Sequence, residues 1–364
     1  SSSPSWRGGE VVIKKNQWII NTHQIEAHNG NQIEYNGSTS SYNAQVDYGF
    51  FVQNHIKTLD TFGEWYFNPS TKKVAVYFGS SSPSSLHVEV STLDNLLTKD
   101  YRDDNILIEN IHFSGANKNT IEMKGGNNLK VKDSEIRFSG ENGILGLSVV
   151  NFTIERNLIA DTYNNAMYLR YGNDNAIIQD NQVENTANAP GRTANDDAAG
   201  IGIFAYGENV LVQNNSVINS GFNGIQFNGN YSVVKNNYVD TFCQIKGDGG
   251  GIYTFGGVQY QGYKGRKIQG NIVVNSVGSE GGIPNKGVNY QPLAEGIFLD
   301  DHSNNIEISG NTVGNIRNSG LKMSNANNIL VTNNTFYDAS SSIIVGNSEI
   351  GKDIAHQVDL NVYL

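Results

Sequence analysis

An asparagine recurs in register along most of this 364-residue chain. From residue 104 onward the sequence divides into similar segments, and the short ones are each about 23 residues long, a period typical of stacked coils. Inserts of different length interrupt the series, yet the asparagine returns to the same position after each of them. Because stacked amides one coil apart can hydrogen-bond to one another, the pattern predicts a solenoid. The column comprises Asn157, Asn181, Asn215, Asn237, Asn271, Asn311 and Asn334.

Within each segment the apolar residues alternate over short runs, as at Val210 and Val212 or at Ile306 and Ile308. This is the periodicity of β-strands, and asparagine and glycine supply the turns between them. Helical repeats are excluded because β-branched residues and asparagines interrupt every window. The consensus of leucine-rich repeats is also absent. Each segment is therefore expected to hold roughly three short strands.

These segments resemble the right-handed parallel β-helix of polysaccharide-active enzymes, and the resemblance covers about two thirds of the chain. It implies an all-β fold: a right-handed parallel β-helix (a pectate-lyase-like solenoid) with about nine coils over residues 104–364. Residues 1–103 are less regular, and we expect them to form an N-terminal β-rich region that caps the β-helix or adds a layer to it.

Two stretches of this N-terminal region carry strand signals. Residues 9–35 predict strands separated by turns, and residues 62–78 (FGEWYFNPSTKKVAVYF) predict a hairpin with an Asn-Pro-Ser turn. A Gly-Glu-Trp-Tyr hairpin preceding β-helical coils resembles bacterial glycoside hydrolases of the β-helical β-xylosidase and α-fucosidase type. Those proteins usually carry further N-terminal coils, so the resemblance implies that this chain is a fragment, a processed product or a shorter relative.

Charge, apolar runs and cysteine content exclude several classes of protein. The net charge of −10 argues against a nucleic-acid partner, which would normally need a basic face. No apolar run approaches the ~20 residues of a membrane-spanning helix. The single cysteine, Cys243, excludes an intrachain disulfide and a cysteine-rich zinc site. The chain opens Ser-Ser-Ser-Pro without a signal peptide, which predicts a mature, truncated or cytosolic product. The resemblance implies a secreted, periplasmic or cell-surface bacterial protein.

The last strand of each segment presents aromatic and polar side chains to solvent. Alignment of these strands places one apolar residue of each in an inward column, running from Ile121 through Ile201 to Leu321. Residues one and three positions later then face outward. Aromatic rings stack on the apolar faces of pyranose rings and polar groups orient hydroxyls, so we expect this face to bind a polysaccharide or oligosaccharide. The expected binding residues are Tyr168, Arg170, Asp197, Phe204, Tyr253, Phe255, Phe298 and His302.

Acidic residues gather where long inserts return to these strands. The inserts span residues 186–199, the region around 244–250 and residues 258–294, and they are expected to wall a groove. The candidate catalytic residues of this groove are Asp248, Glu295, Asp300 and Asp301.

Asp248 and the Asp300–Asp301 pair fall on adjacent coils. This could bring two carboxyls within roughly 5–10 Å, the range of retaining and inverting glycosidases. One carboxyl must stay protonated as an acid while the other stays ionised. By resemblance, β-helical hydrolases use acidic pairs from neighbouring coils on this kind of face. Aspartate before glycine is also ordinary turn chemistry, and that alternative stays open.

No metal or cofactor is expected, although Asp196 and Asp197 could bind Ca²⁺ together with loop carbonyls, without EF-hand spacing. Lys246, Lys264 and Arg266 are expected at the rim of the insert loops. Cys243 is expected to be a small buried side chain.

Three functions compete for this scaffold. The favoured one is a glycoside hydrolase that cleaves a plant or algal polysaccharide or oligosaccharide through two carboxyls. A polysaccharide lyase or uronan epimerase would need a cationic base and charge neutralisation, with calcium as one source. The acid-rich groove with Arg170 as its central cation favours hydrolysis. The third function is a non-catalytic, tailspike-like or adhesin-like carbohydrate-binding rod.

Overall fold

A computed structural model describes residues 5–37, 42–101, 103–257, 262–284, 292–346, 356–359 and 361–364. Residues 258–261 and 285–291 of the expected insert therefore lie outside the described residues. The chain forms two compact units. The first comprises Ser1–Val90, Pro190–Asp197 and Gly281–Asn285, and the second comprises Ser91–Ala189, Ala198–Glu280 and Lys286–Leu364.

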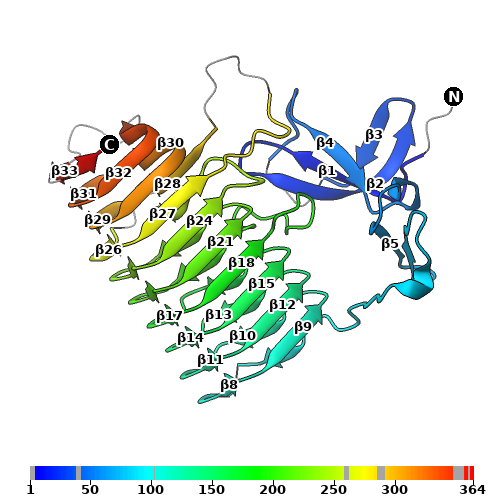
Figure 1. The fold of residues 1–364 in the computed structure, drawn as a ribbon, viewed down its shortest axis with the longest axis horizontal. Helices are drawn as coiled ribbons and strands as arrows, with labels where there is room; N and C mark the ends of the chain where they lie inside the picture. Colours follow the sequence, from blue (N-terminus) through cyan, green and yellow to red (C-terminus); the bar gives the residue numbers. More distant parts are fainter. Residues whose placement is uncertain are drawn as a thin grey trace. The chain divides into compact units, whose positions relative to one another are not determined.

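The second unit is a parallel β-helix, as predicted (Figure 1). Each coil contributes one strand to a ten-stranded sheet and two strand segments to an eighteen-stranded sheet. The strands of the ten-stranded sheet are β8 (Leu107–Glu109), β11 (Lys130–Lys132), β14 (Thr153–Glu155), β17 (Ile177–Gln179), β20 (Leu211–Gln213), β23 (Val233–Lys235), β26 (Arg266–Gln269), β29 (Asn304–Ser309), β31 (Asn327–Thr332) and β33 (His356–Asp359).

The eighteen-stranded sheet consists of two rows of parallel strands. The first row contains β9 (His112–Ala116), β12 (Glu135–Ser139), β15 (Leu158–Thr162), β18 (Gln182–Thr186), β21 (Ser216–Ser220), β24 (Tyr238–Phe242) and β27 (Ile272–Ser276). The second row contains β7 (Leu97–Lys99), β10 (Ile121–Lys124), β13 (Ile144–Leu147), β16 (Met167–Arg170), β19 (Ile203–Tyr206), β22 (Ile225–Asn228), β25 (Gly249–Phe255) and β28 (Ala294–Asp300). The remaining strands are β30 (Thr312–Ser324) and β32 (Thr335–Gly346), which run through both rows, and β34 (Val362–Tyr363).

The asparagine column forms the predicted ladder inside the coils. Each side-chain Nδ2 donates to the Oδ1 of the next asparagine, with distances such as 3.0 Å from Asn215 to Asn237 and 3.0 Å from Asn237 to Asn271. The same Oδ1 also accepts the backbone N–H of the preceding asparagine, as Asn237 does from Asn215 at 2.9 Å. The ladder continues beyond the predicted column to Asn361, which accepts from Asn334.

Many other asparagines serve the turns. The residue before each ladder asparagine is left-handed, as at Asn214 (φ 55°) and Asn236 (φ 55°). Asparagine and glycine tolerate this conformation best, which explains the Asn-Asn and Gly-Asn pairs of the sequence. The excess of asparagine therefore has two structural causes, the ladder and the left-handed turns.

The register of the second row differs from the prediction at one coil. Met167 pairs with Ile203, and Ile203 pairs with Ile225, so the predicted inward position of Ile201 is wrong by two residues. The error arises because Gly200-Ile201 and Gly202-Ile203 fit the Gly-Ile pattern equally well. Gly202 occupies the corner before the strand, where a Cβ would lie 2.5 Å from Val217 Cγ1 and 2.6 Å from Gly224 O.

The interior combines apolar side chains with the ladder, with short buried polar side chains such as Thr186 and Ser220, and with a few long polar ones. Cys243 is buried as predicted, whereas Lys246 and Arg266 are also buried and do not lie at a loop rim. Lys246 Nζ donates to Ala199 O at 2.9 Å, and Arg266 donates to Thr254 Oγ1 at 2.9 Å. Their stems fill space inside the coils while backbone and hydroxyl oxygens accept from their heads, which is why burial is tolerated.

The first unit contains an antiparallel sheet and a hairpin, both predicted from the sequence. Val11, Ile13 and Ile25 form the core against which Trp6 and Tyr35 pack. In the hairpin turn, Asn68 Oδ1 accepts from the backbone of Ser70 and Thr71. The elements are β1 (Glu10–Lys14), β2 (Ile20–Asn29), β3 (Gln32–Tyr35), β4 (Phe50–Gln53), β5 (Trp65–Asn68), β6 (Lys73–Val76) and the 3₁₀ turns η1 (Ile56–Thr58) and η2 (Pro83–Ser85). None of the helices in the described ranges is long and apolar enough to cross a membrane.

Candidate active site

The acidic residues predicted from the sequence lie on neighbouring coils of the β-helix. β25 pairs with β28 in parallel, and β28 pairs with the second half of β30. Asp248 directly precedes β25, and Asp300 ends β28. The predicted adjacency of these two coils is therefore confirmed.

A glycine corner shapes the start of β25. A Cβ on Gly251 would lie 2.3 Å from Val273 Cγ1, and a Cβ on Gly250 would lie 3.1 Å from both Ile252 O and Phe298 Cβ. Only glycine fits here without displacing neighbours. The neighbouring coil can therefore pack closely on the start of β25, and the Asp248 side chain lies 3.5 Å from Lys322 of β30, measured from Oδ1 to Nζ.

Lys322 links two carboxyls at this corner. Its Nζ lies 3.5 Å from Asp248 Oδ1 and 3.4 Å from Glu295 Oε1. The ammonium also lies 4.3 Å from the centre of the Phe298 ring, a cation–π contact. Because Lys322 is only 19% exposed, these contacts are partly shielded from solvent. The lysine therefore neutralises part of the negative charge of the acidic cluster.

Glu295 is fully buried, unlike the other acidic residues of the cluster. Its oxygens accept from Asn318 Nδ2 at 2.8 Å, from the Ser319 backbone at 2.9 Å and from Ser319 Oγ at 2.8 Å. A carboxyl whose oxygens are occupied in this way does not contact a ligand on the surface. The structure thus places this predicted catalytic residue behind the cluster, in contact with Lys322.

The pKa of the Asp248 carboxyl is raised. Burial is the largest cause, and the negative charges of Glu295 and Asp301 add to it, while Lys322 opposes it. Burial disfavours the charged form of a carboxyl, and so do like charges nearby. Asp248 is therefore biased toward the protonated form.

Asp300 is oriented by two donors. Tyr253 Oη donates to its Oδ2 at 2.7 Å, and the backbone N–H of Asp301 donates to its Oδ1 at 2.8 Å. Burial raises the pKa of Asp300, these two hydrogen bonds lower it, and the charges of Asp248 and Asp301 raise it again. The charge of Asp248 thus acts on the protonation of Asp300, and the charge of Asp301 acts on both aspartates.

Asp301 and His302 form the turn that follows β28. Asp301 Oδ1 accepts from Asn325 Nδ2 at 2.8 Å, which fixes this carboxyl against the next coil. His302 adopts a left-handed φ of 63°, and its Nδ1 lies 2.9 Å from Gly257 O. Both side chains are half-buried beside the cluster, and both have a structural role in the turn.

The aromatic residues pair between neighbouring coils. Tyr253 and Phe298 make an edge contact with ring centres 5.4 Å apart, and Tyr168 and Phe204 make one at 5.1 Å. Phe204 is the register partner of Tyr168, which follows from the corrected position of Ile203. The prediction of exposed rings is wrong for Tyr168 (8% exposed) and Phe298 (1%), since neighbouring side chains cover them.

Half-buried side chains remain available on this face at Phe204, Tyr253 and Phe255. Arg170 is also half-buried, and its Nη1 donates to Tyr168 Oη at 2.7 Å while its guanidinium lies 5.0 Å from the Tyr171 ring centre. The tyrosines thus hold the arginine against the sheet, on a coil separate from the acidic cluster.

Asp197 is not part of this arrangement. It belongs to the first compact unit, where Tyr42 Oη donates to its Oδ2 at 3.3 Å. Within the part of the chain that the structure describes, no group of three or more histidine, cysteine or acidic side chains could hold a metal ion. The predicted calcium site at Asp196 and Asp197 therefore has no such cluster to support it.

Sequence reasoning missed two residues of the cluster, Lys322 and Asn325. Both lie on the coil after Asp300, and the predicted column already placed Lys322 next to Phe298. The sequence could have revealed both residues if the same strand register had been searched for cationic and amide side chains beside the acidic residues.

Comparison with known proteins supports the fold. The family model described as "Right handed beta helix region" matches residues 99–239 and 195–354. The right-handed coiling that it describes agrees with the handedness predicted for this chain. No curated protein matches significantly in sequence.

Solved structures with similar folds share little sequence. A protein named glycoside hydrolase matches with a TM-score of 0.63 at 13% identity, covering 94% of this chain and 68% of its own. A mannuronan C-5 epimerase A-module from Azotobacter vinelandii matches with a TM-score of 0.46 at 15% identity, covering 72% and 65%. A tailspike protein of an E. coli bacteriophage, in complex with a pentasaccharide, matches with a TM-score of 0.49 at 11% identity, covering 69% and 49%.

Proposed function

Since the chain belongs to the family of right-handed β-helix proteins, we propose that it is a glycoside hydrolase acting on a plant or algal polysaccharide or oligosaccharide. The acidic cluster carries this proposal. Two aspartates on neighbouring coils both have a raised pKa: burial is the largest cause for each, and the charge of Asp248 adds to the rise at Asp300. An ordinary turn needs no such pair, whereas a two-carboxyl reaction does.

Asp248 is the proposed general acid. Its carboxyl is biased toward protonation by burial and by the neighbouring charge of Glu295. In the reaction it transfers its proton to the glycosidic oxygen as the bond between that oxygen and the anomeric carbon breaks. The leaving sugar departs as a neutral alcohol, and Asp248 is left as a carboxylate beside Lys322.

Asp300 is the proposed second carboxyl. Tyr253 and the Asp301 N–H both donate to it, and such donors stabilise the ionised form. As a carboxylate it either removes a proton from the attacking water or bonds to the anomeric carbon directly. In both cases one water molecule is consumed for each bond cleaved.

Glu295 and Lys322 are positioning residues in this scheme. Glu295 is fixed by Asn318 and Ser319, and it holds the lysine that pairs with Asp248. Glu295 and Lys322 therefore set both the position and the protonation of the Asp248 carboxyl without contacting the substrate. Tyr253 and Phe255 supply aromatic surface next to the cluster for the sugar ring.

The similar solved structures support this choice to a limited extent. The protein named glycoside hydrolase shares the fold over 94% of this chain, and we carry its reaction class over as part of the proposal. The low identity of 13% gives no information about the sugar or the linkage.

A panel of plant and algal polysaccharides and oligosaccharides tests the proposal. Reducing ends and the absorbance of unsaturated products near 235 nm are followed in parallel for each substrate. Reducing ends without absorbance are the expected result. Absorbance would instead identify a lyase, chain remodelling without cleavage an epimerase, and binding without either product a carbohydrate-binding rod.

A further inference from the structure

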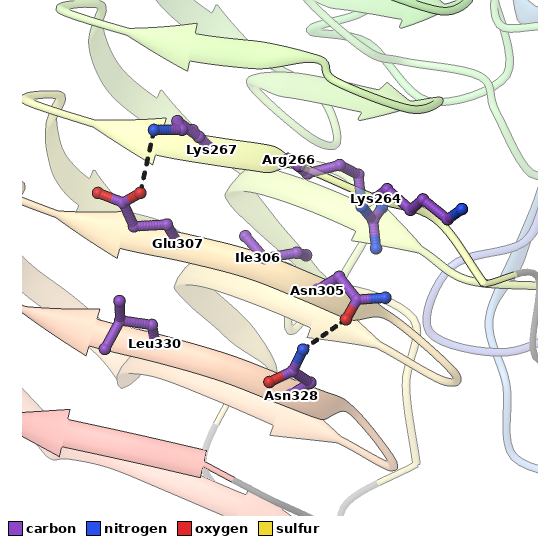
Figure 2. A pocket seen from close by; sticks show the side chains of 9 residues that line it. Lys264, Arg266, Lys267, Asn305, Ile306, Glu307, Asn328 and Leu330 are labelled. Carbon is purple, nitrogen blue, oxygen red and sulfur yellow. Dashed lines mark hydrogen bonds and ion pairs between the residues drawn. The ribbon is translucent and has the colours of Figure 1, made fainter.

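A second, separate hollow lies on the outer face of the ten-stranded sheet (Figure 2). It has a volume of about 480 Å³ and spans β26, β29 and β31. The acidic cluster lies on the other sheet, at β25 and β28. The hollow therefore takes no part in the reaction proposed above.

Three cationic residues line this hollow. Lys264, Arg266 and Lys267 line it together with a single acidic residue, Glu307. In a chain with a net charge of −10, such a local excess of positive charge stands out. It would attract an anion to a protein that otherwise repels anions.

Lys264 is the cation best placed to meet a ligand. Its side chain is exposed and extends away from the other labelled side chains in Figure 2. In the described parts of the chain its ammonium makes no hydrogen bond or ion pair. Lys267, by contrast, pairs with Glu307 at 3.1 Å, and Arg266 is buried beneath the surface.

The rest of the hollow suits hydroxyl groups and a small apolar surface. Asn328 donates through Nδ2 to Asn305, so its Oδ1 can accept from a ligand hydroxyl. Asn305 itself donates to Tyr263 O and is thereby fixed. Leu330 adds a half-buried apolar side chain at the other end of the hollow, beside Glu307, its register partner on the neighbouring strand.

We propose that this hollow is a non-catalytic binding site for an acidic sugar residue. The carboxylate or sulfate of this sugar contacts Lys264 and its hydroxyls contact Asn328, while the adjoining sugar of the chain lies on Leu330 beside Glu307. The hollow is open and lies across parallel strands, so it can hold two adjoining residues of a longer chain. A site of this kind would keep the protein on an acidic polysaccharide independently of catalysis.

Calorimetric titration with three oligosaccharides tests this proposal at low salt. The probes are hexagalacturonate, a sulfated galactan hexasaccharide and neutral xylohexaose, and mass spectrometry verifies that each stays intact. At least one acidic probe is expected to bind at least tenfold more tightly than xylohexaose. The stronger acidic probe distinguishes a carboxylate site from a sulfate site.

Three variants connect the binding to this hollow. Lys264→Ala is expected to raise the Kd of the acidic probe about tenfold, since it removes a charge-assisted hydrogen bond. Glu307→Gln is expected to lower the Kd of the acidic probe a few-fold, because Lys267 loses its anionic partner. Lys130→Ala removes the same charge on the same sheet, five strands away at β11, and is expected to change nothing.

Two outcomes overturn the proposal. One is that xylohexaose binds as tightly as both acidic probes, or that none of the three binds. The other is that Lys264→Ala and Lys130→Ala change the Kd of the acidic probe equally, which would locate the anion elsewhere.

Discussion

Replacement of one ladder asparagine should destabilise the β-helix far more than its small side chain suggests. Asn237 donates to Asn271 Oδ1 and to Val212 O, both at 3.0 Å. It also accepts the Asn215 backbone N–H at 2.9 Å and Asn215 Nδ2 at 3.0 Å. Asn237→Ala deletes all four hydrogen bonds and removes the side-chain acceptor of the buried Asn215 backbone N–H.

The expected loss follows from these contacts. Four hydrogen bonds at about 1 kcal/mol each give a loss of about 4 kcal/mol in the free energy of unfolding. An unfolding entropy of about 2.1 cal/mol/K per residue makes this a fall of about 5 °C in Tm for a chain of this length. Differential scanning calorimetry of the wild type and the variant measures it.

The control is Asn127→Ala, which removes an exposed asparagine that accepts one hydrogen bond from Asn151. An exposed position of this kind should change the free energy of unfolding by about 0.5 kcal/mol at most. Equal Tm values for Asn237→Ala and the control would refute the reasoning, because the ladder would then contribute nothing beyond ordinary turn hydrogen bonds.

Three further predictions concern titratable groups. Glu295→Gln removes a negative charge that raises the pKa of Asp248, so the basic limb of the pH–rate profile should move to lower pH. Tyr253→Phe removes a hydrogen bond that lowers the pKa of Asp300, so the acidic limb should move to higher pH. Shifts in the opposite directions would contradict these roles. Burial raises the pKa of the Cys243 thiol well above its usual value, so a thiol reagent such as DTNB should react with it only after denaturation; rapid reaction of the native protein would contradict its burial.

The fold was predictable because its repeat leaves a periodic signal. The ladder requires asparagine at one position of every coil, and the sequence shows it despite the inserts. The register failed only at Ile201, where two Gly-Ile pairs follow one another and sequence spacing does not distinguish them.

The site was predictable only in part. The register predicted that Asp248 and Asp300 lie on neighbouring coils, because pairing between strands follows directly from the repeat. It did not predict the burial of Glu295 and Phe298, since burial depends on which side chains of the next coil fold over them. Nor did it predict the role of Lys322, whose contact with Asp248 depends on how the two long side chains extend across the coils between them.

The most direct test of the proposed reaction is the rate of reducing-end release by Asp300→Asn and Asp248→Asn, on the substrate that the panel identifies. Asp180→Asn is a matched control, because Asp180 is exposed and, like Asp248, adopts a left-handed backbone that asparagine tolerates. The proposal predicts a fall of about 10³-fold in kcat for each site variant and no change for the control. Full activity of both site variants would show that this pair of carboxyls does not perform the reaction.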